Sequence, residues 1–557
     1  MNGVTWRTYI FRLGVVAFLA PFVAPVLFAQ PTISNVENAA SNITPGLPNA
    51  GIAQGAIFIV YGSNLGPATL SEAPSAFQST TLSNTSVDIT VGATKVNALM
   101  YYTSAGQVAA LLPSNTPTGS GTVTVTYNNQ TSGTAPITVV ANNLGIFTVN
   151  SSGQGPGIVT YSDYSLVSPL KAANCGGPNT TCGAANPGDT LILWATGLGP
   201  VNGSDASGAG LGVNMPNIPL QLWLGGVQAA VSYQGRSGCC IGEDQIVFTV
   251  PNNVPTGCAV PLLVQIGSEV SNNTVMPVAT GSRDCTPVIS AFASLEQAVP
   301  SGQPITSGHI ELDHFSDGGG IFEDDGKFQF QNILGFDPGT APFILEWLDT
   351  PPLGTCLVYN NLNASWPTPV SGVSQADAGS SFTLQGPNGS VNFAPGPLSE
   401  FNSQGSFLVP GAYSATGTGG SQIGKFTATI SIPPVSTLTT PTNNATATRS
   451  NGLTVNWTGG VANEYMQIEV NSPGDVAGDF GAAAVCTVAA NVGTFAIPSY
   501  VLLALPATPQ GTSAGLVLSA STLNSFTATG LTLGFISTYT NEAGFGYGWG
   551  SGGFTLQ

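Results

Sequence analysis

The chain has 557 residues and a mass of 56.3 kDa, which predicts about four domains at a typical domain length. Only 6% of the residues are charged, with 9 Lys and Arg against 27 Asp and Glu and a net charge of −18. These values disfavour nucleic-acid binding, since too few cations remain to neutralise phosphates, and they also disfavour long helical bundles.

The first 29 residues have the pattern of a secretory signal peptide. Arg7 and Arg12 precede an apolar run, residues 13–28, which ends at the small residue Ala29. Two prolines inside the run disfavour the alternative, an uncleaved membrane anchor. No later stretch is apolar over the ~18 residues that a spanning helix needs. We therefore expect a secreted or cell-surface protein without a transmembrane helix after signal cleavage.

An internal repeat follows the signal segment. Residues 55–67 (GAIFIVYGSNLGP) match residues 188–200 (GDTLILWATGLGP) at an offset of 133 residues. Farther along, residues 107–113 match residues 245–251 at an offset of 138. Separated blocks at nearly constant offset indicate two copies of one fold. The five extra residues of the second copy lie in the stretch that holds Cys239 and Cys240.

Each copy has the pattern of β-strands. Residues 57–61 form a short apolar run that ends in a Gly/Asn turn, and residues 122–127 alternate with period 2. Gly, Pro, Asn and Ser separate such runs every 8–12 residues, which is typical of a sandwich. We therefore predict an all-β chain of tandem immunoglobulin-like β-sandwiches. The expected segments are a signal peptide at 1–29, sandwiches at 30–142 and 143–284, a β-rich domain at 285–435 and an immunoglobulin-like sandwich at 436–557, the last two either separate or one unit.

The repeat resembles a known family. An apolar strand, then Gly-x-Asn-Leu-Gly-Pro, a mid-domain Val-Gly and a late Pro-x-x-x-Pro-x-Gly are similar to the IPT/TIG immunoglobulin-like domains, over residues 33–282. The paired arrangement resembles a domain found in secreted acidobacterial proteins, and residues 377–379 and 386–389 resemble a second such module. The resemblance implies extracellular β-sandwiches without catalytic residues of their own, so it transfers no site residue.

Eight cysteines fit an oxidising compartment. They are Cys175, Cys182, Cys239, Cys240, Cys258, Cys285, Cys356 and Cys486. The absence of CxxC pairs, and of histidines near the cysteines, disfavours a zinc site. Our pairing hypothesis is Cys175–Cys182, Cys258–Cys285 and Cys356–Cys486. The adjacent Cys239 and Cys240 form either a bridge with each other, which would rigidify one loop or act as a redox switch, or bridges elsewhere.

Residues 309–327 hold both histidines and several carboxylates. Calcium prefers several oxygen ligands on a flexible loop, and four aspartates flank a Gly run here: Asp313, Asp317, Asp324 and Asp325. If residues 309–313 form a strand, His309, Glu311 and Asp313 share one face. Three interpretations stay open, namely a calcium site, a catalytic carboxylate pair and a solvated hairpin whose acids protect a sheet edge.

Two other patterns bear on activity. Trp347, Trp366 and the aromatic residues of 545–549 are candidates for a sugar-binding platform, or else for core side chains. The sequence Gly511-Thr-Ser-Ala-Gly515 matches a nucleophile elbow, but the following Leu-Val-Leu predicts a strand where the elbow needs a helix. We therefore expect no enzyme activity.

The sequence thus predicts a non-catalytic secreted or surface protein that acts in adhesion or as structural extracellular material. Its partners would be extracellular polysaccharide, a surface protein or further copies of itself. The alternatives are a carbohydrate-binding protein and a glycan hydrolase that uses carboxylates in 309–325.

Overall fold

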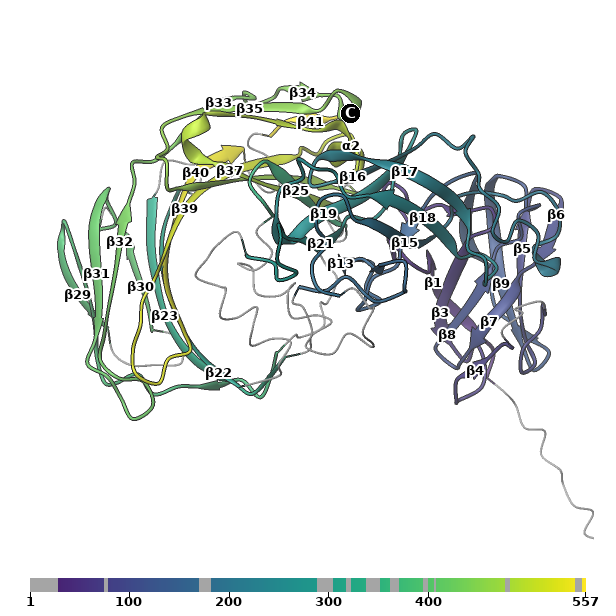
Figure 1. The fold of residues 1–557 in the computed structure, drawn as a ribbon, viewed down its shortest axis with the longest axis horizontal. Helices are drawn as coiled ribbons and strands as arrows, with labels where there is room; N and C mark the ends of the chain where they lie inside the picture. Colours follow the sequence, from purple (N-terminus) through teal and green to yellow (C-terminus); the bar gives the residue numbers. More distant parts are fainter. Residues whose placement is uncertain are drawn as a thin grey trace, which may run out of the picture.

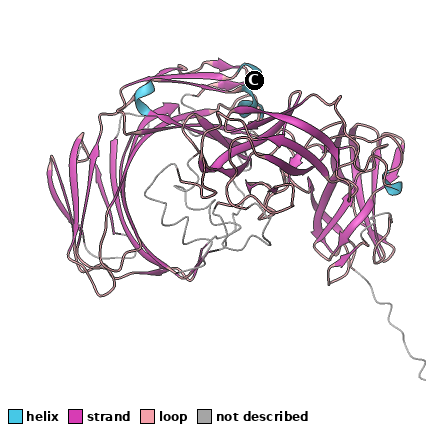
Figure 2. Ribbon diagram, in the orientation of Figure 1, coloured by secondary structure: helices cyan, strands magenta, loops and turns pink. Residues whose placement is uncertain are grey.

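The computed structural model describes residues 29–74, 79–169, 182–287, 304–316, 322–336, 351–360, 370–393, 399–404, 407–475, 481–545 and 553–557. These residues are almost all in strands and turns (Figures 1 and 2). They form three β modules in a row: module 1 (residues 32–140), module 2 (145–278) and module 3 (305–556). No helix among the described residues is long and apolar enough to cross a membrane. The expected signal peptide lies outside the described residues, apart from Ala29.

Module 1 is a sandwich of two antiparallel sheets. One sheet has the order β1-β3-β8-β7-β4, and the other has the order β2-β11-β9-β5-β6 with β10 beside β9 and with β2 parallel to β11. Strand β5 alternates buried and half-buried residues along TSVDITV, so one face packs into the core. The strands are β1 (Thr32–Asn38), β2 (Ile52–Ala53), β3 (Ile57–Ser63), β4 (Ser71–Glu72), β5 (Thr85–Val91), β6 (Thr94–Asn97), β7 (Leu99–Thr103), β8 (Gln107–Leu111), β9 (Gly119–Tyr127), β10 (Gln130–Thr131) and β11 (Ala135–Val140).

Module 2 repeats this plan. Strand β15 pairs with β18 as β3 pairs with β8, and the β5–β6 and β16–β17 hairpins turn at Gly92 and Gly225, both with positive φ. Its ten strands form one sheet that encloses its own core. The elements are β12 (Gly145–Ile146), β13 (Gly155–Pro156), β14 (Val159–Thr160), β15 (Thr190–Thr196), a 3₁₀ turn (Asp205–Ser207), β16 (Leu220–Leu224), β17 (Val227–Arg236), β18 (Asp244–Thr249), β19 (Gly257–Ile266), β20 (Glu269–Val270) and β21 (Thr274–Val278).

Module 3 is organised around a long curved sheet of nine strands. Its order is β25-β37-β36-β39-β40-β22-β23-β27, with β30 beside β23. Two smaller layers cover its outer, convex face, β29-β28-β31-β32 at one end and β33-β35-β38 at the other (Figure 1). Strands from both 285–435 and 436–557 share the large sheet, as the single-unit alternative requires.

The strands of module 3 are β22 (Ile305–Ser316), β23 (Phe322–Ile333), β24 (Gly335–Phe336), β25 (Thr355–Asn360), β26 (Val370–Ser371), β27 (Ser374–Gln375), β28 (Phe382–Gly386), β29 (Gly389–Phe393), β30 (Ser399–Gln404), β31 (Gly411–Gly417), β32 (Phe426–Ile432), β33 (Thr437–Thr440), β34 (Thr446–Ala447), β35 (Leu453–Thr458), β36 (Tyr465–Pro473), β37 (Gly481–Ala489), β38 (Thr494–Ile497), β39 (Gly515–Ser525), β40 (Leu533–Phe545) and β41 (Thr555–Leu556). Two 3₁₀ turns (Arg449–Asn451 and Ala490–Val492) and the short helix α2 (Ser499–Leu503) connect them.

Three disulfides join cysteines of the described residues. Cys258 of β19 is bonded to Cys285, Cys356 of β25 to Cys486 of the neighbouring β37, and Cys239 to Cys240. The first two are the pairs that the sequence suggested, and the third is one of the two alternatives that the sequence left open for Cys239 and Cys240. Cys182 is also disulfide-bonded, and Cys175 lies outside the described residues.

The joint between modules 1 and 2 is built around a buried charge. Arg236, at the end of β17, is 1% exposed and forms an ion pair with the fully buried Asp244. Its Nη2 also donates to the carbonyl oxygen of Gly55 in module 1, at 3.0 Å. Nearby, the carboxylate of Asp205 accepts hydrogen bonds from the backbone N–H and the hydroxyl of Ser114, at 2.7 and 2.8 Å. These bonds fix the two modules relative to each other.

The joint between modules 2 and 3 is mainly apolar. The rings of Trp223 and Tyr500 stack with centroids 4.8 Å apart, and Leu357 of β25 packs against β19 and β21. Gln154 adds a hydrogen bond from its Nε2 to the carbonyl oxygen of Asn360, at 2.7 Å. Buried side-chain contacts therefore connect module 2 to module 1 and to module 3.

Candidate functional site

The hairpin of β22 and β23 carries the histidines and acids that the sequence singled out. In its register, Asp313 lies opposite Asp325 and Glu311 lies opposite Lys327. Because directly opposed residues share a face and faces alternate along a strand, these four side chains and His309 lie together. The expectation that His309, Glu311 and Asp313 share a face is confirmed. Their face is the concave one, since Ile310 and Leu312 pack into the core on the other side.

The concave cluster consists of His309, Glu311, Asp313, Asp325 and Lys327, and close polar contacts connect the first three of these and Lys327. Lys327 Nζ lies 2.9 Å from Glu311 Oε1, and His309 Nε2 lies 3.4 Å from Glu311 Oε2. Strand β40, parallel to β22, supplies the Ser537 hydroxyl 3.0 Å from His309 Nε2 and the Phe535 ring, which stacks on the imidazole at 4.2 Å. These four side chains therefore form a connected network.

Burial sets the protonation states in the concave cluster. It lowers the pKa of His309 to about 4, so the imidazole is neutral at physiological pH. Burial, together with the charge of Glu311 and a hydrogen bond to it, raises the pKa of Asp313 to about 8. For Glu311, burial is outweighed by the hydrogen bonds from Lys327 and Asp313 and by the charge of Lys327, so its pKa lies below the usual value. One carboxyl of the pair is thus protonated and the other ionised.

This carboxyl pair does not have the geometry of a glycosidase. Glycosidases hold their two carboxyl groups about 5–9.5 Å apart so that the sugar, and in inverting enzymes a water, fits between them. Glu311 and Asp313 are hydrogen-bonded to each other and leave no such gap. The geometry of this pair therefore favours a structural or binding role for Glu311 and Asp313.

Asp324 belongs to the opposite face of the hairpin. It is fully buried, and its Oδ1 lies 2.6 Å from Nδ1 of His314. Its Oδ2 accepts backbone hydrogen bonds from Phe407 and Leu408, at 2.7 and 2.9 Å. Asp324 therefore connects β23 to the loop before β31, and it does not converge with Asp313 and Asp325 on one cation. Asp317 lies outside the described residues.

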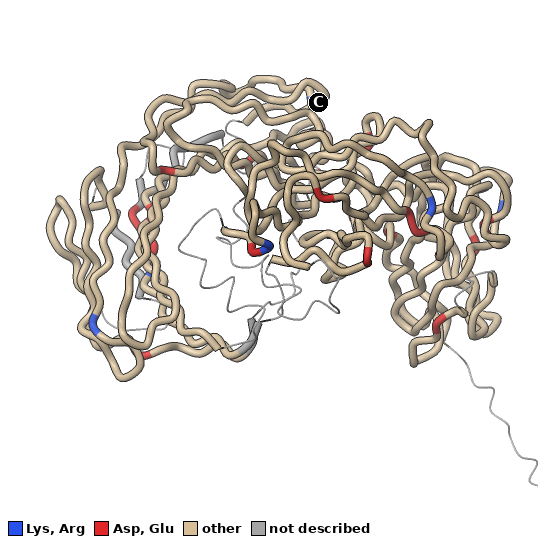
Figure 3. Tube along the Cα trace, in the orientation of Figure 1, with Lys and Arg blue, Asp and Glu red and all other residues tan. Residues whose placement is uncertain are grey.

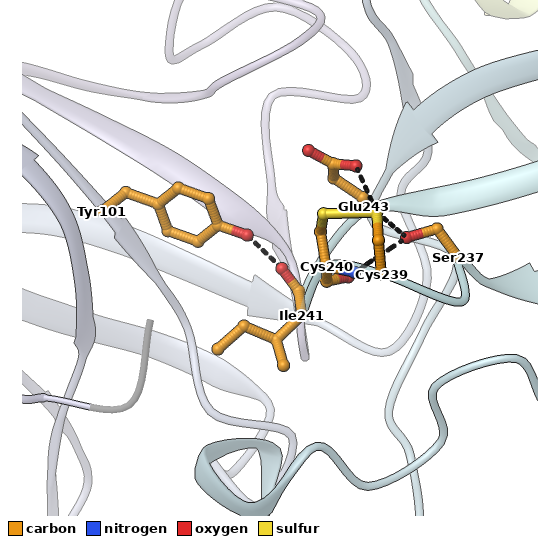
Figure 4. Close-up of a disulfide and its surroundings, with 6 residues drawn as sticks. All are labelled: Tyr101, Ser237, Cys239, Cys240, Ile241 and Glu243. Atoms are coloured by element: carbon orange, nitrogen blue, oxygen red, sulfur yellow. Dashed lines mark hydrogen bonds between the residues drawn. A yellow bond between two sulfur atoms is a disulfide. The ribbon is translucent and has the colours of Figure 1, made fainter. Parts of the chain in front are cut away.

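A second feature is the loop between β17 and β18, which contains the Cys239–Cys240 disulfide (Figure 4). The Ser237 hydroxyl donates to the Cys240 carbonyl at 3.3 Å and accepts from the Cys240 N–H at 3.2 Å. Within the part of the chain that the structure describes, Cys239, Cys240 and Glu243 are the one His/Cys/Asp/Glu group close enough to hold a metal. Both sulfurs are in a disulfide, so they offer no thiolate ligands in this state.

A third feature is a cavity of 290 Å³ in module 3, beside β23 and β28. Its lining residues are Phe328, Phe330, Gln375, Ala376, Asp377, Ala378, Gly379, Phe382 and Gln422. Phenyl rings form its base, and exposed Gln375, Asp377 and Gln422 form its rim. Hydrogen bonds from Ser421 to Asp377, at 2.7 and 2.8 Å, hold the carboxylate in place and lower its pKa.

The cavity and the buried Arg236 are two features that the sequence patterns did not predict. One signal could have predicted the burial of Arg236, namely an arginine within a strand of a chain that has few charges. If such a strand is internal, the arginine needs a buried partner of opposite charge. The candidate sugar platform, Trp347, Trp366 and the aromatic residues of 545–549, falls outside the residues whose side chains are described. Charges are sparse along the whole described trace (Figure 3).

The chain is similar to several proteins of known structure. No family model matches the chain, and no curated protein matches it. A surface glycan-binding protein (SGBP-B) from the mixed-linkage glucan utilization locus of Bacteroides ovatus, in complex with a mixed-linkage heptasaccharide, is 11% identical with a TM-score of 0.14, covering 80% of this chain and 84% of that chain.

Two further structures give similar values. SGBP-B from a complex xyloglucan utilization locus in Bacteroides uniformis is 12% identical with a TM-score of 0.17, over 68% of this chain and 88% of that chain. Domains 4–9 of the surface layer protein SbsC are 12% identical with a TM-score of 0.16, over 92% of this chain and 66% of that chain. At these TM-scores the likenesses carry no argument about function. The class of this chain, a row of β modules, follows from its own sheets.

Proposed function

We propose that this chain is a non-catalytic extracellular protein that serves as a rigid adhesive or structural element at a cell surface, with modules 1 and 2 of the IPT/TIG type. The observation that carries the proposal is the buried contact at both joints. Arg236 is buried against module 1, and Trp223 stacks on Tyr500 of module 3. Rigid joints suit a spacer that transmits position or force, whereas flexible linkers are the default between domains.

The chemistry of the chain supports an extracellular location. Disulfides persist in oxidising compartments, and the described residues contain three of them. The network of His309, Glu311 and Lys327 satisfies its charges internally, which fits a structural role better than an active site.

The proposal is tested with purified residues 30–557. We would measure retention on immobilised polysaccharides and surface proteins, self-assembly by light scattering and electron microscopy, and release of soluble sugars from the same polysaccharides. Retention or assembly without sugar release is the expected result. Sugar release that disappears in the Glu311→Gln variant would refute a non-catalytic role.

A second candidate, binding of extracellular polysaccharide, is favoured by the cavity in module 3. The apolar faces of sugar rings can pack on phenyl rings, and amide and carboxylate groups at a rim can form hydrogen bonds with sugar hydroxyls. Gln375 and Gln422 would serve as the amides, and Asp377 as the carboxylate. Affinity electrophoresis in gels containing single polysaccharides tests this. Gln375→Ala should abolish the retardation, while Gln385→Ala, which changes an exposed glutamine away from the cavity, should not.

A further inference from the structure

The Cys239–Cys240 loop lies at the joint between modules 1 and 2 (Figure 4). It connects β17 to β18, directly after Arg236, and it belongs to the five-residue expansion that module 1 lacks. None of the functions proposed above uses it. Its position and its exposure both bear on what it can do.

Exposure separates this disulfide from the others. Cys239 is exposed and Cys240 is half-buried, so an external reagent can reach the Cys239 sulfur. In the other described pairs the exposure is lower, because Cys258 is half-buried and bonded to Cys285, which is 6% exposed, while Cys356 and Cys486 are 6% and 0% exposed. Thiol–disulfide exchange needs access of the attacking thiolate along the S–S axis, so accessibility selects which bridge reacts.

The residue that follows the disulfide reaches into module 1. Ile241 is 6% exposed and packs against Leu99 and Leu111 of module 1. The Tyr101 hydroxyl donates a hydrogen bond to the Ile241 carbonyl oxygen. The disulfide ring thus lies one residue from a side chain that holds two modules together.

The adjacent glycine strengthens the connection. Thr196 donates from its hydroxyl to the carbonyl oxygen of Gly242 at 2.6 Å and accepts from the backbone N–H of Ile57 in module 1 at 2.9 Å. A Cβ at Gly242 would lie 2.4 Å from Leu111 Cδ1 of module 1, so the loop backbone itself touches the partner module. A change in the loop conformation therefore cannot occur without a change in this joint.

We propose that the Cys239–Cys240 disulfide is a site of exchange with external thiols, and that its opening loosens the joint between modules 1 and 2. A thiolate attacks the Cys239 sulfur, the new bond joins that sulfur to the reagent, and the Cys239–Cys240 bond breaks. Cys240 leaves as a thiolate and takes a proton from water. When the reagent is a dithiol, its second thiolate then releases Cys239 and the reagent departs as a cyclic disulfide, so two electrons pass from the dithiol to the two cysteines.

Opening the ring restores backbone freedom to the loop, because a bridge between adjacent residues confines the peptide bond that joins them. Ile241 and Gly242 then lose their fixed approach to module 1, although the Arg236 ion pair remains. The expected state has modules 1 and 2 still folded and the loop between β17 and β18 accessible. The co-reactant is a small dithiol or an exposed thiol of another extracellular protein.

The test uses residues 30–557 under native conditions with limiting dithiothreitol, followed by maleimide labelling and peptide mass spectrometry. We expect Cys239 and Cys240 to be labelled at least about tenfold faster than Cys258, Cys285, Cys356 and Cys486, since reactivity follows accessibility. Limited proteolysis of the same samples should show a severalfold increase in cleavage within residues 237–243. The double variant Cys239→Ser/Cys240→Ser should show that cleavage without reductant and should not respond further to it.

Tyr101→Phe is the matched control for the joint, because it removes the hydrogen bond to Ile241 without touching either thiol. It should raise cleavage within the loop and leave the labelling order unchanged. Earlier labelling of Cys258 or Cys486, or selective labelling of the vicinal pair with an unchanged cleavage pattern, would overturn the proposal. Neither readout depends on adhesion or polysaccharide binding, so the result is independent of the proposed function.

Discussion

Replacing Arg236 by methionine is the sharpest test of how the first joint is held. The side chain is 1% exposed, pairs with the fully buried Asp244, and donates to the carbonyl oxygens of Gly55 and Gly199 at 3.0 and 2.7 Å. Methionine keeps much of the length of the side chain and removes its charge and all its donors. The change therefore isolates the electrostatic contribution from the packing.

The expected loss of stability is large. Removing one partner of a buried ion pair costs about 3–5 kcal/mol, because the other charge stays buried without compensation. The carbonyl oxygens of Gly55 and Gly199 also lose a donor, at about 1–3 kcal/mol for each one that water cannot reach. We expect a total loss of unfolding free energy of about 5 kcal/mol or more, the sum of the lower ends of these contributions. Arg236→Met combined with Asp244→Asn should recover about 2 kcal/mol, since no unpaired charge remains.

Urea unfolding of residues 30–557, followed by intrinsic fluorescence and by limited proteolysis at each urea concentration, measures these effects. Proteolysis reports which module opens first, because a chain of three modules need not unfold in one step. If Arg236→Met lowers the free energy of unfolding by less than about 1 kcal/mol, the ion pair contributes no more than a solvent-exposed one does. A double variant less stable than the single one would also refute the reasoning.

Three other changes test the remaining parts of the structure. The folded-state pKa of Asp313, about 8, lies above the usual 3.8, so this carboxyl contributes its full stabilisation below pH 3.8 and loses it as the pH rises towards 8. The melting temperature of the Asp313→Asn variant, relative to that of the unchanged protein, should therefore increase between pH 4 and 8. A difference in melting temperature that stays constant over this range would contradict the reasoning. At the second joint, Tyr500→Ala should lower the free energy of unfolding by about 3–5 kcal/mol. Tyr164 is 68% exposed, so Tyr164→Ala should lower it by less than about 0.5 kcal/mol in the same urea titration. Replacing Cys356 and Cys486 by serine opens a loop of 130 residues and should lower stability by about 4–5 kcal/mol in calorimetry; an unchanged transition would mean that the sheet alone holds module 3 together.

Local patterns predicted the parts of the fold and site that depend on neighbouring residues. The alternation in residues 309–313 placed His309, Glu311 and Asp313 on one face, and the register of β22 with β23 agrees. That prediction needs nothing beyond the period of two along a strand. The same period separates Asp324 from Asp325, but the sequence could not show that the loop before β31 would supply the hydrogen bonds that occupy Asp324.

Long-range pairing decided the rest. Strand β22 lies parallel to β40 although more than 200 residues separate them, and this pairing brings Phe535 and Ser537 against His309. No local pattern specifies which of many similar strands will be neighbours, because that choice depends on how complete layers cover each other's apolar faces. The cavity in module 3 has the same origin, since its lining comes from segments that meet only in the folded chain.

The sequence by itself thus determined the β class and the duplicated first half, because composition, repeat offset and alternation can be read from neighbouring residues. Tertiary structure alone decided that strands from both 285–435 and 436–557 share one large sheet, that Arg236 is buried at a joint, and that the Cys239–Cys240 loop touches a second module. These features depend on contacts between distant segments, whose stability comes from burying apolar and charged groups together, and a linear pattern does not record which surfaces will meet.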